Sequence, residues 1–248
     1  MLIAQISDTH LTLDTPDADR RADDLRRTIA DINMLDPIPD VIVHTGDIVH
    51  NGLAGEYKRA AELLSESRPP VYVIVGNKDN REALRETFSS QNYLQSSAPF
   101  ITYAVDDFPV RLVMLDTLDP QSNKGNFCVE RAALLNEFLK TDKPIAVFAH
   151  HPPFEVKVGP EPWNFGTEEA MNRLRNGLTA SSKIAGLFCG HVHRSTTGRV
   201  GGIPTKVIPS IATPLRWGDY PEPMQSRPTY FLHRYDSTEG FSTLTRIV

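Results

Sequence analysis

The sequence has little of several features that mark particular protein classes. Only two of its 248 residues are cysteine, Cys128 and Cys189, and they lie too far apart for a zinc spacing or a disulfide framework. No basic tract is present, and the formal charge of -5 argues against a nucleic-acid scaffold that works through broad electrostatics. No segment approaches the ~18 apolar residues that a membrane span needs. The apolar start, Met1–Ile6, is too short for a secretory signal.

These absences favour a soluble, cytoplasmic protein that binds neither a nucleic-acid polymer nor a membrane. Hydrophobic residues make up 40% of the chain and charged residues 23%, as in ordinary globular proteins. The length suffices for one large hydrophobic core.

What the sequence does contain is an alternation of short apolar runs and longer amphipathic segments. Runs rich in Val and Ile are typical of strands buried on both faces, and they occur at Leu2–Ile6, Val41–Val43, Val71–Val75 and Ile145–Ala149. Apolar residues at three- and four-residue spacing predict helices, over Arg20–Leu35, Glu56–Ser65 and Glu130–Leu139. Asp79 or Asn80 can cap a further helix that continues to Phe88. The order of these elements is typical of an α/β protein with βαβ units.

The later part of the chain is richer in predicted strands. Ile101–Val105 and Val110–Leu115 predict a hairpin, and further strands are predicted at Thr196–Val200, Ile203–Ile208 and Thr229–Tyr235. Neither a repeat nor a low-complexity linker divides the chain, so we expect residues 1–248 to form one domain. Two proline-rich stretches, Pro152–Pro162 and Pro214–Pro228, are expected to be long loops, which in compact domains are usually functional or disordered.

Five short stretches, each at the end of a predicted strand, contain residues of types that bind metal ions. They are Asp8-Thr9-His10, Gly46-Asp47, Gly76-Asn77-Lys78-Asp79, His150-His151-Pro152 and Gly190-His191-Val192-His193. Each stretch alone is a weak signal, because such pairs occur by chance and an aspartate after a strand is often a helix cap. Together they are far more specific, because ligands at the carboxyl ends of strands in an α/β sheet converge on one crevice.

This ordered set resembles the calcineurin-like metallophosphoesterases. The motifs that carry the resemblance span nearly the whole chain and read ISDTH, GDIV, GNKD, HHPP and CGHVH. The segments GDIVHNGLAGEY and AVDDFPVRLVMLDT suggest the branch that holds bacterial class III cyclic-nucleotide phosphodiesterases and related glycerophosphodiesterases. The resemblance implies a four-layer αββα sandwich of two mixed sheets flanked by helices, with a dinuclear metal site between the strand ends. It also implies a homodimer.

The resemblance assigns a ligand role to seven residues. Those implied are Asp8, His10 and His193 for one ion, Asn77, His150 and His191 for the other, and Asp47 as a bridge between both. Such a mixed nitrogen and oxygen set leaves the identity of the metal open among Mn, Fe, Zn and Co. Two ions ~3.5–4 Å apart can polarise a phosphoryl oxygen and generate hydroxide from bound water near neutral pH.

The adjacent residues His150 and His151 require a choice. Consecutive side chains of a strand point to opposite faces, so both are not expected to reach one ion. In the resembled family the ligand stands two residues before the proline, which is His150 here. We therefore expect His151 to be structural or to support the ligands.

The remaining candidates receive structural interpretations. His44 is expected to be a hydrogen-bonded interior residue of its strand, and His233 a structural residue of the last strand. His50 can border the pocket without a catalytic role. Cys189, at the end of the apolar run Ile184–Phe188 that precedes Gly190, is expected to be a small buried hydrophobe rather than a zinc ligand.

The main departure from the family pattern is Lys78. In the resembled family a histidine stands there, beside the substrate, where it is thought to contact the phosphate and assist the leaving oxygen. A lysine ammonium can donate hydrogen bonds but cannot accept them. Lys78 can therefore act as a donor to the phosphate or to the leaving oxygen, or it can be a surface lysine with its head in solvent. The candidate catalytic residues are Lys78 and Asn77, the second also as a metal ligand.

The sequence thus favours a metal-dependent phosphodiesterase that hydrolyses small phosphodiesters, cyclic nucleotides first, by attack of a metal-bound hydroxide. Glycerophosphodiesters or other alkyl phosphodiesters are the alternative substrates. A hypothesis from another class is a metal- and nucleotide-binding regulatory protein with turnover reduced by Lys78. Substrate-facing residues are expected in the loops Asn51–Glu56, Pro152–Phe165 and Ile211–Asp219. In these loops three aromatic residues can either stack on a base or pack within the loops, namely Phe154, Trp163 and Trp217.

Overall fold

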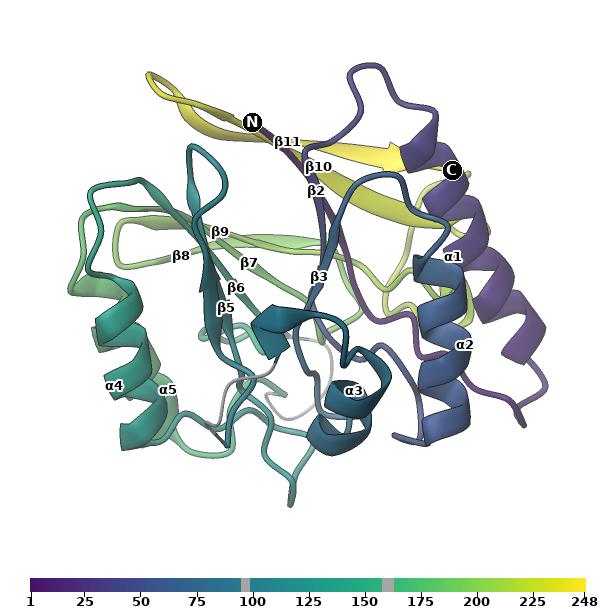
Figure 1. The fold of residues 1–248 in the computed structure, drawn as a ribbon, viewed down its shortest axis with the longest axis horizontal. Helices are drawn as coiled ribbons and strands as arrows, with labels where there is room; N and C mark the ends of the chain where they lie inside the picture. Colours follow the sequence, from purple (N-terminus) through teal and green to yellow (C-terminus); the bar gives the residue numbers. More distant parts are fainter. Residues whose placement is uncertain (95–98, 158–162) are drawn as a thin grey trace.

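Two β-sheets lie against each other with helices on both outer faces in the computed structural model, which describes residues 1–94, 99–157 and 163–248 (Figure 1). Helices α1 (Ala18–Asn33) and α2 (Ala54–Leu64) cover one sheet. Helices α4 (Val129–Phe138) and α5 (Glu168–Thr179) cover the other. The predicted αββα sandwich is confirmed. No helix among the described residues is both long and apolar enough to cross a membrane.

The first sheet has five strands among the described residues, in the order β11-β10-β1-β2-β3. Strand β1 (Leu2–Ile6) pairs in parallel with β2 (Val41–His44), and β2 pairs in parallel with β3 (Val71–Val73). Strand β10 (Thr229–Asp236) runs antiparallel to β1, and β11 (Gly240–Ile247) forms the edge. The three parallel strands therefore end at the same edge of the sheet, where their loops carry the first three motifs.

The second sheet has six strands, again counted among the described residues, in the order β4-β5-β6-β7-β9-β8. In chain order they are β4 (Tyr103–Val105), β5 (Arg111–Leu115), β6 (Ile145–Ala149), β7 (Ile184–Cys189), β8 (Thr196–Val200) and β9 (Ile203–Val207). Strands β5, β6 and β7 are parallel, so the two histidine motifs follow neighbouring strand ends.

The apolar core between the sheets holds the two sets of strand ends together. Ile3 and Ile42 from the first sheet belong to one buried cluster with Phe148 and Phe188 from the second, each 0–2% exposed. Burying one such side chain contributes ~1.5–3 kcal/mol. A second cluster, which includes Leu174 of α5, lies between the second sheet and its helices.

Helix α3 (Arg81–Thr87) follows the two residues that the sequence offers as its N-cap, Asp79 and Asn80. The Oδ1 atom of Asn80 accepts hydrogen bonds from the backbone amides of Glu82 and Ala83, both at 3.0 Å. Asn80 is therefore the N-cap. Asp79 instead turns inward, where its carboxylate accepts from the backbone amide of Gly76 at 2.8 Å.

The predicted strands and helices agree with the structure to within a few residues, but α5 and β11 are not predicted by the sequence analysis. The signal for α5 is present: Thr167 caps the helix, and buried residues recur at four-residue spacing, at Ala170, Leu174 and Leu178. The stretch Pro152–Pro162 lies partly outside the described residues, and Pro214–Pro228 begins within the short 3₁₀ turn Thr213–Leu215.

Glycines allow the motif loops to approach each other closely. A Cβ atom on Gly76 would lie 2.2 Å from the Oδ1 atom of Asp47, and one on Gly190 would lie 2.1 Å from the Oγ atom of Ser7. Gly46 has a φ of +94°, in the region that favours glycine. The glycines of the GD, GN and GH motifs are therefore required by packing between loops.

This packing predicts the effect of adding one methyl group. Gly76→Ala should destabilise the fold by ~1–3 kcal/mol, as overpacking does, because the new Cβ meets Asp47. Gly202→Ala is the control, since a Cβ there meets nothing within 4 Å. Thermal unfolding of both variants measures the difference. Equal stabilities would mean that the two loops can separate without cost.

Candidate metal centre

The motif loops are joined by backbone hydrogen bonds at the edge where the parallel strands end. The amide of Asp8 donates to the carbonyl of Gly46 at 3.0 Å, which links the loops after β1 and β2. The amide of Gly190 donates to the carbonyl of His150 at 3.0 Å, which links the loops after β7 and β6. These bonds join the motifs in two pairs, and the amide of His191, which donates to Oδ2 of Asp8 at 3.1 Å, joins one pair to the other.

Most of the predicted ligands have a left-handed backbone, which non-glycine residues rarely adopt. The φ values are 54° for Asp8, 44° for His10, 50° for Asp47, 74° for His191 and 50° for His193. Such residues cost ~1–3 kcal/mol each and cluster at functional sites, where the surrounding structure imposes them. Here the sharp turns let Asp8 and His10, and likewise His191 and His193, face the site together.

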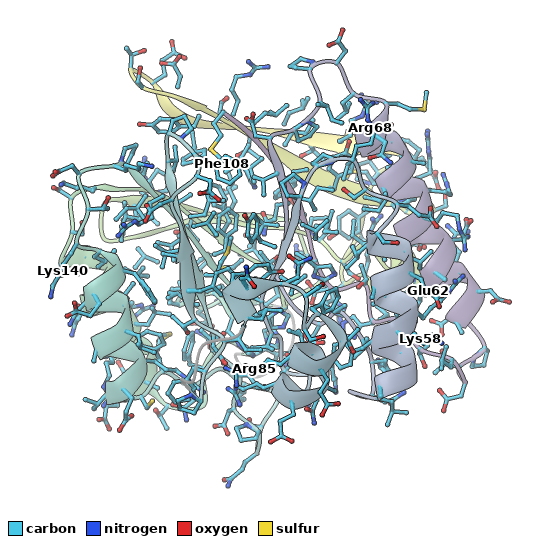
Figure 2. The ribbon with its side chains drawn as sticks, viewed as in Figure 1. Lys58, Glu62, Arg68, Arg85, Phe108 and Lys140 are labelled. Atoms are coloured by element: carbon cyan, nitrogen blue, oxygen red, sulfur yellow. The ribbon has the colours of Figure 1, made fainter. Side chains whose placement is uncertain are left out.

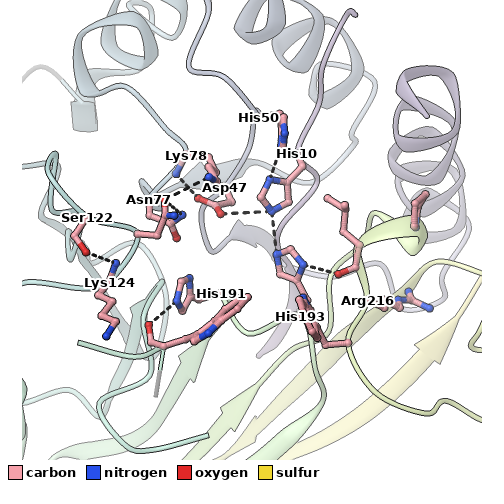
Figure 3. Close-up of a pocket in the computed structure, with 15 residues that line it drawn as sticks. His10, Asp47, His50, Asn77, Lys78, Ser122, Lys124, His191, His193 and Arg216 are labelled. Atoms are coloured by element: carbon pink, nitrogen blue, oxygen red, sulfur yellow. Dashed lines mark hydrogen bonds and ion pairs between the residues drawn. The ribbon is translucent and has the colours of Figure 1, made fainter. Parts of the chain in front are cut away.

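Four predicted ligands form a first group around the facing rings of His10 and His193. Their Nε2 atoms lie 3.0 Å apart (Figure 3). An oxygen of Asp8 lies 3.3 Å from Nε2 of His193, and Oδ2 of Asp47 lies 3.4 Å from Nε2 of His10. Donor atoms of all four lie within 4.8 Å of one another.

A second group lies on the other side of Asp47. Nε2 of His150 lies 3.5 Å from Oδ1 of Asp47 and 3.1 Å from Oδ1 of Asn77. The ring of His191 lies 5.0 Å from that of His150. Asp47 thus turns one oxygen toward each group, as a bridging carboxylate requires.

Backbone carbonyls orient three of the histidines. Because a carbonyl oxygen only accepts, the ring nitrogen that faces it must carry the hydrogen. Nδ1 of His150 donates to Thr45 at 2.8 Å, and Nδ1 of His193 donates to Leu215 at 2.6 Å, which leaves each Nε2 atom available. Nε2 of His191 donates to Trp163 at 2.8 Å, which leaves its Nδ1. Metal-binding histidines are commonly held in this way.

His151 differs from these three because both of its ring nitrogens contact protein groups outside the predicted ligand set. Nδ1 lies 2.8 Å from the hydroxyl of Thr117, and Nε2 lies 3.3 Å from the carbonyl of Asn123. A nitrogen of His151 does lie within 4.8 Å of donor atoms of His150 and His191. The partners nevertheless favour a supporting role, as expected from the sequence.

The charges of the two groups depend on each other. Burial raises the pKa of Asp8, but His193 and His150 outweigh burial and lower it to about 2. Burial lowers the pKa of His150, but Asp47 and Asp8 outweigh burial and raise it to about 9. Burial holds the pKa of His10 at about 3. The carboxylates are therefore ionised, and they need positive charge beside them.

This donor set fits two divalent ions. It combines imidazole nitrogens with carboxylate and amide oxygens, which suits first-row transition metals. Its carboxylates are 0–2% exposed, and buried charges of this kind are normally paired or coordinate metals.

The two groups meet a pocket of about 740 Å³, whose floor is formed by five of the seven predicted ligands: His10, Asp47, Asn77, His191 and His193. Lys78 lines it, and its Nζ atom donates to Oδ1 of Asn123 at 3.3 Å. Nδ2 of Asn77 donates to the same oxygen at 3.4 Å. Asn123 thus contacts both candidate catalytic residues, although the sequence analysis did not identify it.

The segment Ser122–Lys124 lines the pocket as well, and nothing in its polar sequence distinguishes it from an ordinary turn. Of the loops expected to face the substrate, two contribute to the lining, with Trp163 and residues 214–217. Among the described residues, Asn51–Glu56 supplies none of the lining and Phe154 lies away from it, close to Gly198.

The histidines outside the predicted ligand set lie where the sequence predicts them to lie. His44 is buried, with its ring bonded to the hydroxyl of Thr9 at 2.9 Å. His233 is buried between Gln5 and Thr243. His50 lines the pocket, with its Nδ1 atom 3.5 Å from Nδ1 of His10.

Cys189 is a free, fully buried thiol. Burial raises its pKa, and the residue packs in the apolar core between the second sheet and its helices. It is therefore a structural residue, as the sequence analysis expects.

Comparison with known proteins adds independent information. Residues 1–195 match the family model for calcineurin-like phosphoesterases. A probable glycerophosphodiester phosphodiesterase of Arcobacter nitrofigilis is 33% identical over 258 positions, covering 100% of this chain and 93% of that protein. A cAMP/cGMP dual-specificity phosphodiesterase of Mycobacterium tuberculosis is 28% identical, covering 83% of this chain and 66% of that protein. A dimetal phosphatase of Danio rerio has a similar fold, with a TM-score of 0.71 and 14% identity over 99% of this chain and 98% of that one.

The geometry predicts different outcomes for the adjacent histidines. His150→Ala should lose an ion from the second group, because it removes the Nε2 atom that lies 3.5 Å from Oδ1 of Asp47. His151→Ala should keep two ions per chain, because its nitrogens bond to protein groups. Metal analysis at saturation measures both, and circular dichroism checks that each variant folds. The reverse ranking would show that His151 is the ligand.

Proposed function

Since the chain belongs to the calcineurin-like phosphoesterases, we propose that it is a phosphodiesterase that hydrolyses small phosphodiesters with the help of two divalent metal ions. The observation that carries this proposal is the sharing of Asp47 between two groups of donors at the floor of one pocket. The side chain that faces this floor from the GNKD loop is a cation, Lys78, which suits an anionic diester.

Seven residues would hold the two ions. One group consists of Asp8, His10 and His193, the other of Asn77, His150 and His191, and Asp47 serves both. This mixed set of nitrogen and oxygen donors suits Mn, Fe, Zn and Co and does not select one of them. When bound, they would polarise a phosphoryl oxygen and lower the pKa of a water molecule.

The chain's own residues would bind the diester and stabilise its leaving group. The backbone amide of Lys78 donates to Oδ1 of Asp47 at 2.7 Å, so the position of the lysine is tied to the shared carboxylate. Asn123 holds its ammonium at the pocket wall. From there Lys78 can donate a hydrogen bond to the phosphate or to the leaving oxygen.

Cyclic nucleotides, which the sequence places first, and glycerophosphodiesters are both candidate substrates, since the relatives carry both kinds of name. The hypothesis of a regulatory protein that binds nucleotides without efficient turnover has no observation in its favour. A cytoplasmic location and a homodimer rest on the sequence and the family resemblance alone.

The proposal is tested by hydrolysis of a generic diester with added Mn²⁺. Asp47→Asn should reduce kcat/KM by more than about 100-fold even in excess metal, because replacing even the supporting partners of ligands costs ~10–100-fold. Asp142→Asn, which changes an exposed aspartate, should leave the rate unchanged. A wild-type protein that holds two ions and hydrolyses no diester would refute the enzyme and favour the regulatory hypothesis.

The role of Lys78 is tested by comparing leaving groups. A positioned proton donor contributes ~10²–10⁴-fold, and an alkoxide needs it far more than a nitrophenolate does. Lys78→Ala should therefore slow cyclic or alkyl diesters much more than nitrophenyl diesters. Lys58→Ala is the matched control, because Lys58 lies exposed on α2, away from the pocket (Figure 2). Equal losses on both substrates would leave Lys78 with phosphate binding only.

A further inference from the structure

Two tryptophans, Trp163 and Trp217, meet in the pocket wall. Both line the pocket beside His191 and His193, and their ring centroids lie 5.2 Å apart at an interplanar angle of 76°. Trp163 is half-buried and Trp217 is 44% exposed. An edge-to-face pair with this much exposed ring surface is available to a ligand.

The pair is attached to the metal centre through its backbone. The carbonyl of Trp163 accepts from Nε2 of His191 at 2.8 Å. The amide of Trp217 donates to the carbonyl of His193 at 3.1 Å. The ring of Trp163 also lies 6.4 Å from the ring of His191. These bonds hold the backbone of both tryptophans beside the donor groups.

We propose that Trp163 and Trp217 form a subsite for a nucleobase on one arm of the phosphodiester. Nearly perpendicular rings make a corner in which a planar group stacks on one indole and turns its edge to the face of the other, the two arrangements that aromatic rings prefer. A flexible glycerol arm gains neither contact. The inference rests on the proposed function and selects nucleotide-derived diesters within it.

The charges around the pocket disfavour the other group that aromatic rings bind, a quaternary ammonium. Lys78 and Lys124 line the pocket, and among the described lining residues the only carboxylate is Asp47, which faces the donor groups. A choline arm would therefore meet like charge. A neutral base does not.

The first experiment compares two substrates that differ only in the base: adenosine 3′,5′-cyclic phosphate and the same cyclic sugar phosphate with hydrogen in place of adenine. Trp163→Leu and Trp217→Leu should each lower kcat/KM for the nucleotide by ~5- to 150-fold, the effect of losing one stacking contact. The base-free substrate should change by less than about threefold. Phe154→Leu is the matched control, because Phe154 is an aromatic of a nearby loop that does not line the pocket.

The second experiment measures binding without turnover. The chain contains only two tryptophans, so its indole fluorescence reports on this pair alone. Adenosine monophosphate added to the Mn²⁺-loaded protein should quench that fluorescence saturably, whereas ribose 5-phosphate should not. Trp163→Phe and Trp217→Phe then show whether each ring contributes, and metal analysis of every variant confirms that two ions are retained.

Different outcomes test the tryptophan subsite and the phosphodiesterase activity separately. No hydrolysis of any diester would refute the proposed function. Hydrolysis of both substrates with equal losses in the tryptophan variants would overturn the subsite and leave the phosphodiesterase standing. A wild-type preference for glycerophosphocholine that disappears in the same variants would show that the pair binds a quaternary ammonium instead.

Discussion

Burying two carboxylates beside each other costs several kcal/mol for each unless positive charge and hydrogen-bond donors surround them. Asp8 and Asp47 are 0% and 2% exposed, and backbone amides and imidazole rings surround them. The amide of His191 donates to Asp8, the amide of Lys78 donates to Asp47, and imidazole rings face the remaining oxygens. The left-handed turns, the close approach of the loops and the fixed ring orientations all bring these amide and imidazole groups to the two aspartates.

The same requirement explains how a chain with a formal charge of -5 can attract an anion. Two divalent ions against two carboxylates would leave a local excess of about two positive charges, to which Lys78 would add at the pocket wall. Surface charges farther away than about 8–10 Å are largely screened at physiological salt. The local charge therefore governs binding, and the net charge of the protein does not oppose it.

The sequence predicts the floor of this site well, because the floor consists of residues directly after strands. Once Leu2–Ile6, Val41–Val43 and Ile145–Ala149 are recognised as buried strands, the position of each motif follows from the parallel order. The sequence does not predict Asn123 or the carbonyls of Trp163 and Leu215, which hold ligands and lysine in place. Their roles depend on where long loops return in space, and no residue pattern marks a carbonyl for such a contact.

The floor and the wall of the pocket belong to different kinds of loop. The donor groups belong to loops tied to one another by backbone bonds, whereas Trp163 and the segment Ser122–Lys124 belong to longer connections between a strand and a helix. The two parts touch at a few hydrogen bonds, such as that from His191 to Trp163, made through the backbone of the wall residue. Replacing the side chain of Trp163 therefore leaves that bond intact, whereas Asn123 contacts Asn77 and Lys78 through its own side chain. The ring of Trp163 can therefore change without altering the arrangement of the donor groups on the floor.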